Sequence, residues 1–227
     1  MEKERSISGV VINNMIDDEV YQYINSKRGY LLVKRMIDIV LSLIALVILM
    51  PFFVLLALII VIDSPGKIFF IQERVGKEGE IFKIYKFRSM NIDAESKRNT
   101  LLEKNKMDGP VFKIVDDPRV TKVGRFMRKT SLDELPQLFN ILRGDMSIVG
   151  PRPLVTYETK EFNTYQNLRH NVKPGLTCYW QIAGRNEVSF NEWMDLDIKY
   201  IKEISFKTDF LIFLKTIKVV LLGIGAY

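Results

Sequence analysis

The sequence predicts an α+β protein that is mostly helical, with an N-terminal re-entrant membrane helix broken at a proline, a small β-hairpin and interfacial amphipathic helices. Three observations predict this class. An apolar run occupies residues 39–62, two strand-like segments flank a glycine-bearing loop, and helical patterns alternate with Gly/Pro loops in the C-terminal half.

Length and composition limit the alternatives. A chain of 227 residues has room for one domain beside the membrane segment. Its formal net charge of +6 suits nucleic acid, anionic lipid or phosphorylated ligands without choosing among them. One cysteine, Cys178, excludes an intrachain disulfide, and with one histidine, His170, a Cys- or His-rich metal site is not expected. We expect Cys178 to be a small buried hydrophobe and His170 to lie at the surface.

The first thirty residues are polar. Residues 17–26 are expected to form a short helix capped at Asp17 or Asp18. This region lacks the apolar core of a secretory signal peptide, so a reducing, cytoplasmic-face location is expected. Residues 1–30 are therefore interpreted as a flexible or docking extension.

The apolar run at residues 39–62 is interrupted only by Ser42 and Pro51. More than about 18 consecutive apolar residues are typical of a membrane-embedded helix. Pro51 removes a backbone N–H near the middle and disfavours a straight helix by about 3 kcal/mol. Split there, each arm is shorter than the ~30 Å hydrocarbon core. A kinked single-pass helix and a hairpin that enters and leaves by one leaflet both remain open.

Basic residues flank the apolar run on both sides, and this favours the hairpin. Lysine and arginine beside an apolar segment prefer the cytoplasmic side of a membrane. A hairpin keeps both basic clusters on that side, whereas a spanning helix places one of them on the opposite face. The clusters are Lys27, Arg28, Lys34 and Arg35 before the run, and Lys67, Arg74 and Lys77 after it.

A β-hairpin is predicted after a turn at residues 63–66. Residues 68–71 and 81–87 are strand-like, and the loop between them carries glycines at residues 76 and 79. Residues 91–104 are then expected to form a polar, exposed helix.

Two further helices are expected at residues 190–204 and 206–222. The first is amphipathic and should bury its aromatic side. The second is apolar but carries lysines on one face, which suits a helix lying in the lipid interface; a packed core helix with extended lysines is the alternative. The defining residues are Trp193, Leu196 and Tyr200 in the first helix, and Lys207, Lys215 and Lys218 in the second.

Acidic and basic side chains are concentrated between residues 124 and 153. Asp133 and Glu134 are adjacent, and arginines frame them on both sides. Guanidinium groups bind phosphate oxygens, and a carboxylate can bind Mg²⁺ or attack phosphorus as a nucleophile, so this combination suits phosphoryl chemistry. A structural alternative is a capping box formed by Ser131 and Glu134. Pro136 fits that register badly and favours a helix that begins at Asp133 or Glu134.

Three motifs follow one another along the chain: "YKFRSM" at residues 85–90, "SLDELPQLFNILRGDMSIVGPRP" at residues 131–153 and "KPGLTCYWQIAGRN" at residues 173–186. Together they resemble the bacterial sugar transferase family, the monotopic phosphoglycosyl transferases that act on polyprenyl phosphate. The resemblance runs from about Lys34 to the C-terminus. Larger members carry further domains ahead of the catalytic part, so the chain resembles a small member with an unusual N-terminal extension.

The resemblance implies transfer of hexose-1-phosphate from a UDP-sugar to undecaprenyl phosphate, with release of UMP, at the start of capsule, exopolysaccharide or O-antigen assembly. It implies that Asp133 is the nucleophile that forms a covalent phosphosugar intermediate. Glu134 would complete the pair, and both carboxylates would hold Mg²⁺. The residues that would bind the phosphates or the sugar nucleotide are Arg128, Arg152, Lys86, Arg88, Gln181 and Arg185.

The resemblance also implies the domain organisation. Residues 1–30 would be the extension, residues 31–63 a re-entrant membrane helix broken at Pro51, and residues 64–227 a catalytic domain with an interfacial C-terminal helix. The catalytic domain would lie on the cytoplasmic face of the bacterial inner membrane. Family members often have serine before this proline, whereas Met50 stands here, so the carbonyl freed near Val47 needs another partner.

The implied partners are a UDP-sugar, undecaprenyl phosphate and membrane lipid, with no nucleic acid and with a homodimer as a further possibility. The form "TCYWQ" resembles members that transfer glucose or galactose. Two alternatives remain: a membrane-anchored scaffold without catalysis, which belongs to a different class, and a family member that binds a UDP-sugar without turnover.

Overall fold

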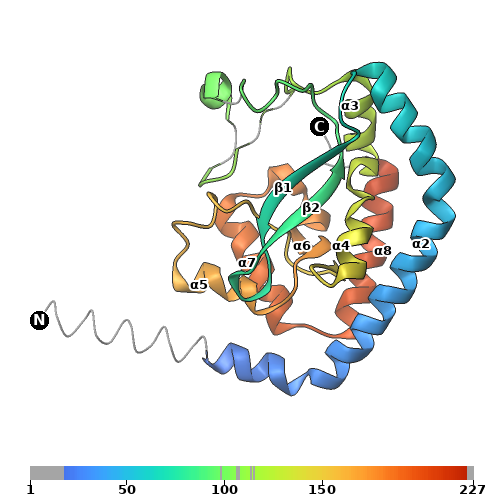
Figure 1. Cartoon of the computed structure of the whole chain (residues 1–227). Coiled ribbons are helices and arrows are strands. Elements are labelled where there is room, and N and C mark those ends of the chain that lie inside the picture. Colours follow the sequence, from blue (N-terminus) through green and yellow to red (C-terminus); the bar gives the residue numbers. More distant parts are fainter. Residues whose placement is uncertain (1–17, 98, 106–107, 113, 115, 224–227) are drawn as a thin grey trace, which may run out of the picture.

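The computed structural model describes residues 18–97, 99–105, 108–112, 114 and 116–223. Residues 18–26 are helical, as expected, while the predicted cap at Asp17 lies outside the described residues. The following helix, α2 (Arg28–Asp63), arches around the outside of the remaining elements (Figure 1). By length and composition α2 is able to cross a membrane. The predicted class, mostly helical α+β with a long apolar helix and a small hairpin, is confirmed.

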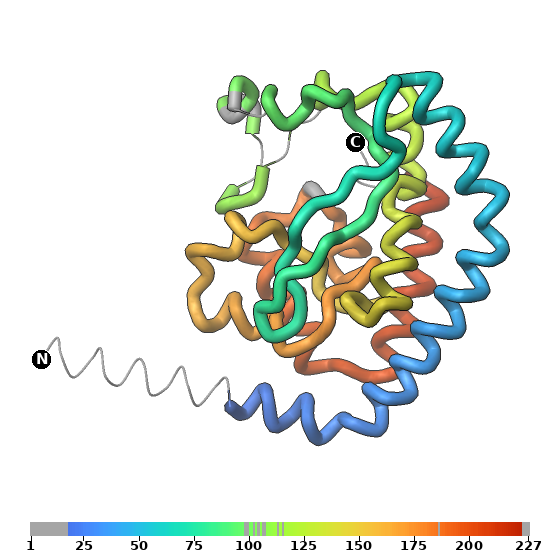
Figure 2. The backbone as a smooth tube through the Cα atoms, in the orientation of Figure 1, coloured from blue at the N-terminus to red at the C-terminus, as the bar shows by residue number. Residues whose placement is uncertain are grey.

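Pro51 lies inside α2 and does not end it. The tube through the backbone bends toward the domain midway along this helix, so that its two ends approach the same body (Figure 2). A proline deletes one backbone hydrogen bond and displaces the preceding turn, and this bends a helix. Helix α2 continues through the bend because residues before and after Pro51 pack on the domain. Packing is confined to an inner stripe of α2, and the outward faces are exposed. The buried stripe is Lys34, Asp38, Ser42, Leu46, Phe53, Leu56 and Ile60.

Polar contacts tie the start of α2 to the domain. The Lys34 ammonium lies 2.5 Å from an Asp209 carboxylate oxygen. Arg35 donates to the carbonyl oxygens of Ile141 and Leu142, at the end of α4 (Gln137–Arg143). These contacts fix the direction in which the apolar helix leaves the domain.

The far end of α2 is tied to the same domain. An Asp63 carboxylate oxygen accepts from the backbone N–H of Val123, at 3.2 Å, in α3 (Lys122–Lys129). The Arg88 guanidinium donates to the carbonyl oxygens of Ser64 and Pro65. Both ends of the apolar helix therefore contact one body.

The predicted hairpin is present as β1 (Phe69–Val75) and β2 (Ile81–Phe87), which pair antiparallel. The bounds of β2 match the prediction. β1 continues four residues beyond the predicted end at residue 71, because the reversal needs only the short turn η1 (Lys77–Gly79). Glu78 lies in the left-handed region within that turn.

The expected helix at residues 91–104 is wrong. Residues 92–97 form turns and η2 (Asn99–Lys104) is a 3₁₀ segment. Short polar side chains here bond the backbone locally: Ser96 donates to the Asp93 carbonyl at 2.8 Å and Thr100 to the Lys97 carbonyl at 2.9 Å. Such bonds compete with a regular helix.

The remaining elements build the core beneath the hairpin. β3 (Ser147–Val149) pairs parallel with β4 (Gly175–Thr177). The expected amphipathic helix is α7 (Phe190–Lys202), whose Trp193 and Tyr200 are buried as predicted. The short segments are η3 (Leu132–Glu134), which precedes α4, and α5 (Thr164–Asn167), η4 (Leu168–Asn171), α6 (Tyr179–Ala183) and η5 (Arg185–Glu187), which lie between β3 and α7 in the chain.

The last helix, α8 (Phe206–Leu222), is a surface helix. It buries only Thr208, Ile212 and Val219, so the alternative of a packed core helix does not describe it. Its exposed large hydrophobic side chains are Phe206, Phe210, Leu211, Phe213, Leu214, Ile217, Leu221 and Leu222.

Candidate active site

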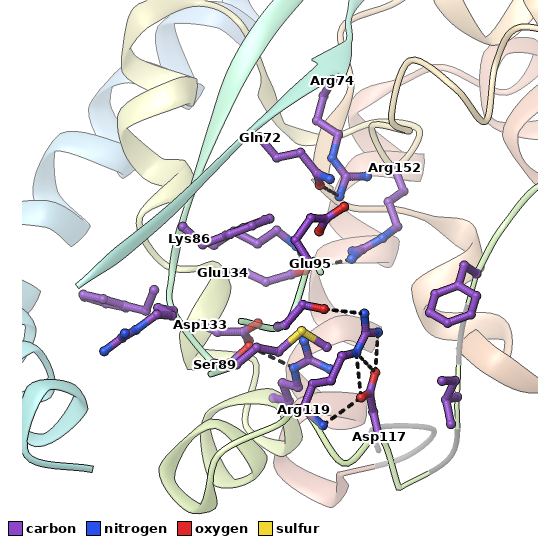
Figure 3. Close-up of a pocket in the computed structure, with 18 of the residues that line it drawn as sticks. Gln72, Arg74, Lys86, Ser89, Glu95, Asp117, Arg119, Asp133, Glu134 and Arg152 are labelled. Carbon is purple, nitrogen blue, oxygen red and sulfur yellow. Dashed lines mark hydrogen bonds and ion pairs between the residues drawn. The ribbon is translucent and has the colours of Figure 1, made fainter. Parts of the chain in front are cut away.

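A cavity of about 760 Å³ opens between the hairpin, η3, α6 and the loop after β3. Figure 3 shows how side chains from these separate elements converge on it. Every site residue that the sequence predicted lines this cavity. These residues are Lys86, Arg88, Arg128, Asp133, Glu134, Arg152, Gln181 and Arg185.

The acidic pair lies in the 3₁₀ turn η3 and not in a helix. Ser131 has a φ of 56° and its side chain makes no cap hydrogen bond, so the structural alternative of a capping box is excluded. The turn is closed by i→i−3 bonds, from Glu134 N–H to Ser131 O and from Leu135 N–H to Leu132 O. Pro136, which has no N–H, is the N-cap of α4. The expected helix start at Asp133 or Glu134 is therefore displaced to Gln137.

Glu134 is paired with two cations through one of its carboxylate oxygens. One of its carboxylate oxygens lies 2.8 Å from the Lys86 ammonium and 2.9 Å from Nη2 of Arg152. Burial alone would raise the pKa of Glu134, but Arg152 and Lys86 outweigh burial and hold that pKa well below its usual value. Glu134 is thus an ionised acceptor that orients two cations in the cavity.

Asp133 has the opposite character. It is 8% exposed, and among the described residues none donates a hydrogen bond to its carboxylate. Burial, followed by the adjacent Glu134 charge, raises the pKa of Asp133, while Lys86 and Arg128 oppose the rise. Of the two carboxylates, Asp133 is therefore the one available to a ligand.

Arg128 reaches the cavity through a close helix contact. A Cβ on Gly124 would lie 2.0 Å from the Ser89 carbonyl oxygen, so only glycine lets α3 approach β2's end this closely. One turn later, Nε of Arg128 donates to the Ser89 hydroxyl at 2.9 Å. Burial lowers the pKa of Arg128, and the Asp133 carboxylate opposes this, so an anion beside the guanidinium favours its charged form.

The other predicted basic and amide residues divide into two groups. Arg88 borders the cavity, but its guanidinium donates hydrogen bonds to backbone carbonyl oxygens just after α2. Gln181 and Arg185 line the wall formed by α6 and η5 and are 5% and 7% exposed. Nη2 of Arg185 lies 3.4 Å from the Ser131 hydroxyl, which links this wall to the turn that carries Asp133.

Sequence reasoning missed Arg74, Arg119 and Trp180 as cavity residues. Arg74 donates to the Pro153 carbonyl at 3.0 Å and to Gln72 at 2.7 Å, and burial lowers its pKa to about 10. Its signal was available, since residues 72 and 74 share one face of a strand. Arg119, paired with Asp117 at 2.6 Å, lies in a turn, and Trp180 lies in α6, whose five residues are too few to show a period.

The residues present fit a magnesium ion held together with a phosphorylated ligand. Within the described part of the chain, no group of three or more His, Cys, Asp or Glu residues could cage a metal. Mg²⁺ is commonly held by one or two carboxylates plus substrate phosphates. Asp133, with an unoccupied carboxylate beside Glu134, supplies that kind of partial site.

The long apolar helix is typical of a membrane-associated protein, and the cavity beside it combines a buried acidic pair with basic side chains. The chain belongs to the bacterial sugar transferase family, whose model matches residues 29–223. This confirms the family that the three motifs indicated.

Three relatives illustrate the match. Galactosyl transferase CpsE of Streptococcus agalactiae is 49% identical over 201 residues, which cover 88% of this chain and 44% of the relative. The undecaprenyl-phosphate galactose phosphotransferase of Salmonella typhimurium is 42% identical, with 89% and 43% covered. Exopolysaccharide production protein ExoY of Sinorhizobium fredii is 40% identical, with 86% and 88% covered. The chain thus spans less than half the length of the first two relatives.

Proposed function

We propose that the protein is a phosphoglycosyl transferase that moves hexose-1-phosphate from a UDP-sugar to undecaprenyl phosphate and releases UMP. The observation that carries this proposal is the unequal pair at the cavity: Glu134 forms ion pairs with Lys86 and Arg152, whereas the Asp133 carboxylate accepts no hydrogen bond from the described residues. A scaffold surface would gain nothing from burying an unpartnered carboxylate, which costs free energy.

The chemistry follows from these positions. An Asp133 oxygen attacks the sugar-bearing phosphorus of the donor, and the bond from that phosphorus to the bridging oxygen breaks, so that UMP leaves. A phosphate oxygen of the lipid then attacks the same phosphorus and returns the electron pair to the Asp133 carboxylate. Arg128, Arg152 and Lys86 offset the charge on the phosphoryl oxygens. When bound, Mg²⁺ would neutralise diphosphate charge and favour the ionised form of Asp133.

The membrane arrangement that suits this reaction is a re-entrant α2. Ties to one domain at both ends of the helix support it, because a spanning helix would carry Asp63 to the other side of the bilayer from Lys34. The outward faces of α2 expose a long series of aliphatic side chains, such as Val47, Ile48 and Leu58, which water would not favour. We place the domain on the cytoplasmic face of the inner membrane, where nucleotide sugars and basic flanks are expected.

The exposed face of α8 supports the same placement. Its phenylalanines suit the headgroup boundary, while Lys207, Lys215 and Lys218 can extend to anionic lipid. Helices α2 and α8 meet where the Tyr30 and Phe206 rings lie 4.8 Å apart. The two apolar surfaces together would seat the cavity near the depth of the lipid phosphate.

Among hexose donors we propose UDP-galactose first, because two of the three relatives named above are named for galactose. UDP-glucose is the second candidate.

The test is UMP release by the full chain in detergent with Mg²⁺, undecaprenyl phosphate and a panel of UDP-sugars. Asp133→Asn should abolish release, because the amide cannot attack phosphorus. Asp195→Asn is the matched control, since Asp195 is an exposed carboxylate on α7 that accepts from the Tyr165 hydroxyl. Full activity in Asp133→Asn would exclude the nucleophile assignment. Binding of a UDP-sugar without release by the wild type would favour the non-catalytic alternative.

A further inference from the structure

Arg152 is held in the cavity by more than its ion pair with Glu134. Its guanidinium carbon lies 5.4 Å from the centre of the Trp180 ring. Trp180 in turn stacks on Trp193 of α7, with ring centres 4.5 Å apart and an interplanar angle of 21°. The Arg152 guanidinium therefore lies beside a stack of two indole rings, Trp180 and Trp193, the second of which belongs to α7.

A second connection runs from α7 to the backbone of the same arginine. Nη2 of Arg169, in η4, donates to the carbonyl oxygen of Arg152. The same nitrogen lies 2.8 Å from a carboxylate oxygen of Asp197 on α7. Arg169 is 3% exposed and Asp197 is 1% exposed, so solvent does not compete for either contact.

The two connections start from neighbouring positions on one helix. Trp193 and Asp197 are four residues apart and therefore lie on one face of α7, one turn from each other. The Trp180–Trp193 stack supports the Arg152 side chain, and the Asp197–Arg169 contact holds the Arg152 main chain. Two supports restrict a long side chain that would otherwise sample many rotamers.

Stability alone is a weak explanation for the Arg169–Asp197 pair. Replacing a buried ion pair by apolar side chains of similar size is often neutral or stabilising. Burial raises the pKa of Asp197 to about 6 and Arg169 opposes the rise, so the carboxylate is kept in a costly state. The pair therefore needs another role. Within the part of the chain that the structure describes, its one hydrogen bond toward the cavity goes from Arg169 to the Arg152 carbonyl.

The structure assigns Arg169 and Asp197 as positioning residues that set the location of Arg152 for a donor phosphate. This inference rests on the proposed function, because it takes Arg152 as a phosphate ligand. Neither residue was indicated by the sequence motifs, and neither lines the cavity.

The test replaces the pair by apolar side chains in the full chain, Arg169→Met with Asp197→Leu. We expect the thermal unfolding midpoint to be retained, because no buried charge is left unpaired. We expect kcat/KM for the UDP-sugar to fall about ten- to hundredfold, since small displacements of a positioning group have costs of this size. UDP affinity, read by calorimetry, should fall about tenfold. Asp195→Asn on the outer face of α7 is the matched control and should change none of these.

A folded double variant with wild-type UDP affinity and wild-type kcat/KM would overturn the positioning role. If the double variant fails to fold, Arg169→Lys carries the test: it keeps a positive charge opposite Asp197 on a shorter side chain, and a folded variant with unchanged UDP affinity would have the same meaning. The two proposals fail differently. A wild type that binds UDP but releases no UMP overturns the proposed function only, because UDP affinity still reports the position of Arg152. A wild type that does not bind UDP overturns both.

Discussion

Asp133 and Glu134 are neighbours in the chain, yet their surroundings move their pKa values in opposite directions. The difference arises from two cations, Lys86 and Arg152, which both contact Glu134. Lys86 comes from β2 and Arg152 from the loop after β3, so the contrast depends on the fold. The sequence motifs indicated the residues of this site, but they could not indicate which carboxylate is paired.

His170 makes a prediction about pH at the same scale. Expected at the surface, it is instead half-buried beside Phe162, with ring centres 6.3 Å apart, and burial lowers its pKa to about 4. A folded-state pKa below the ordinary value of about 6.5 means that the unfolded chain takes up the proton first. The resulting stability is present above about pH 6.5 and is lost as the pH falls toward 4.

The loss should reach up to about 3 kcal/mol. Unfolding midpoints measured from pH 7 to pH 4 should fall less steeply in His170→Gln than in the wild type. Because His170 is the only histidine, the difference between the two curves is specific to this site. Parallel curves would show that the ring is not shielded.

At the scale of elements, the approach of α3 to Ser89 controls where Arg128 lies. Gly124→Ala places a methyl group against the Ser89 carbonyl and should push α3 away. We expect a loss of stability of about 1–3 kcal/mol and about a tenfold loss of UMP release. Gly29→Ala is the control, because nothing lies within 4 Å of the added carbon. Equal behaviour of the two variants would contradict this account of Arg128.

Elements with a regular period were predictable, whereas irregular ones were not. The apolar face of residues 190–204 predicted α7 with close bounds, and the strand-like residues 81–87 after a glycine-bearing loop predicted β2. Residues 91–104 misled because local side-chain bonds, rather than composition, decide their structure. Helix α4 begins at Gln137 and not at the predicted Asp133 or Glu134, because Ser131 adopts a left-handed conformation that no pattern of residue types predicts.

For the whole molecule, the central feature is that the apolar helix returns to the domain it left. The apolar run and Pro51 indicated a bend, but not that Arg35 would join α4 and Asp63 would join α3. These contacts depend on a tertiary arrangement that a single sequence does not encode in any local pattern. They join the apolar helix to α3, which carries Arg128, and to α4, which follows Glu134 in the chain.

Sidedness of the two ends of α2 tests this account. Arg28, the first residue of α2, and Lys67, which follows its end, are both exposed, so Arg28→Cys and Lys67→Cys each introduce one reactive thiol. Cys178 is 2% exposed and burial raises its thiol pKa to about 12, so the wild type is the unreactive control. With a membrane-impermeant maleimide, both variants should remain unlabelled in intact cells and both should label after lysis. Labelling of one variant alone in intact cells would mean that α2 spans the bilayer, and would contradict a helix that enters and leaves by the same face.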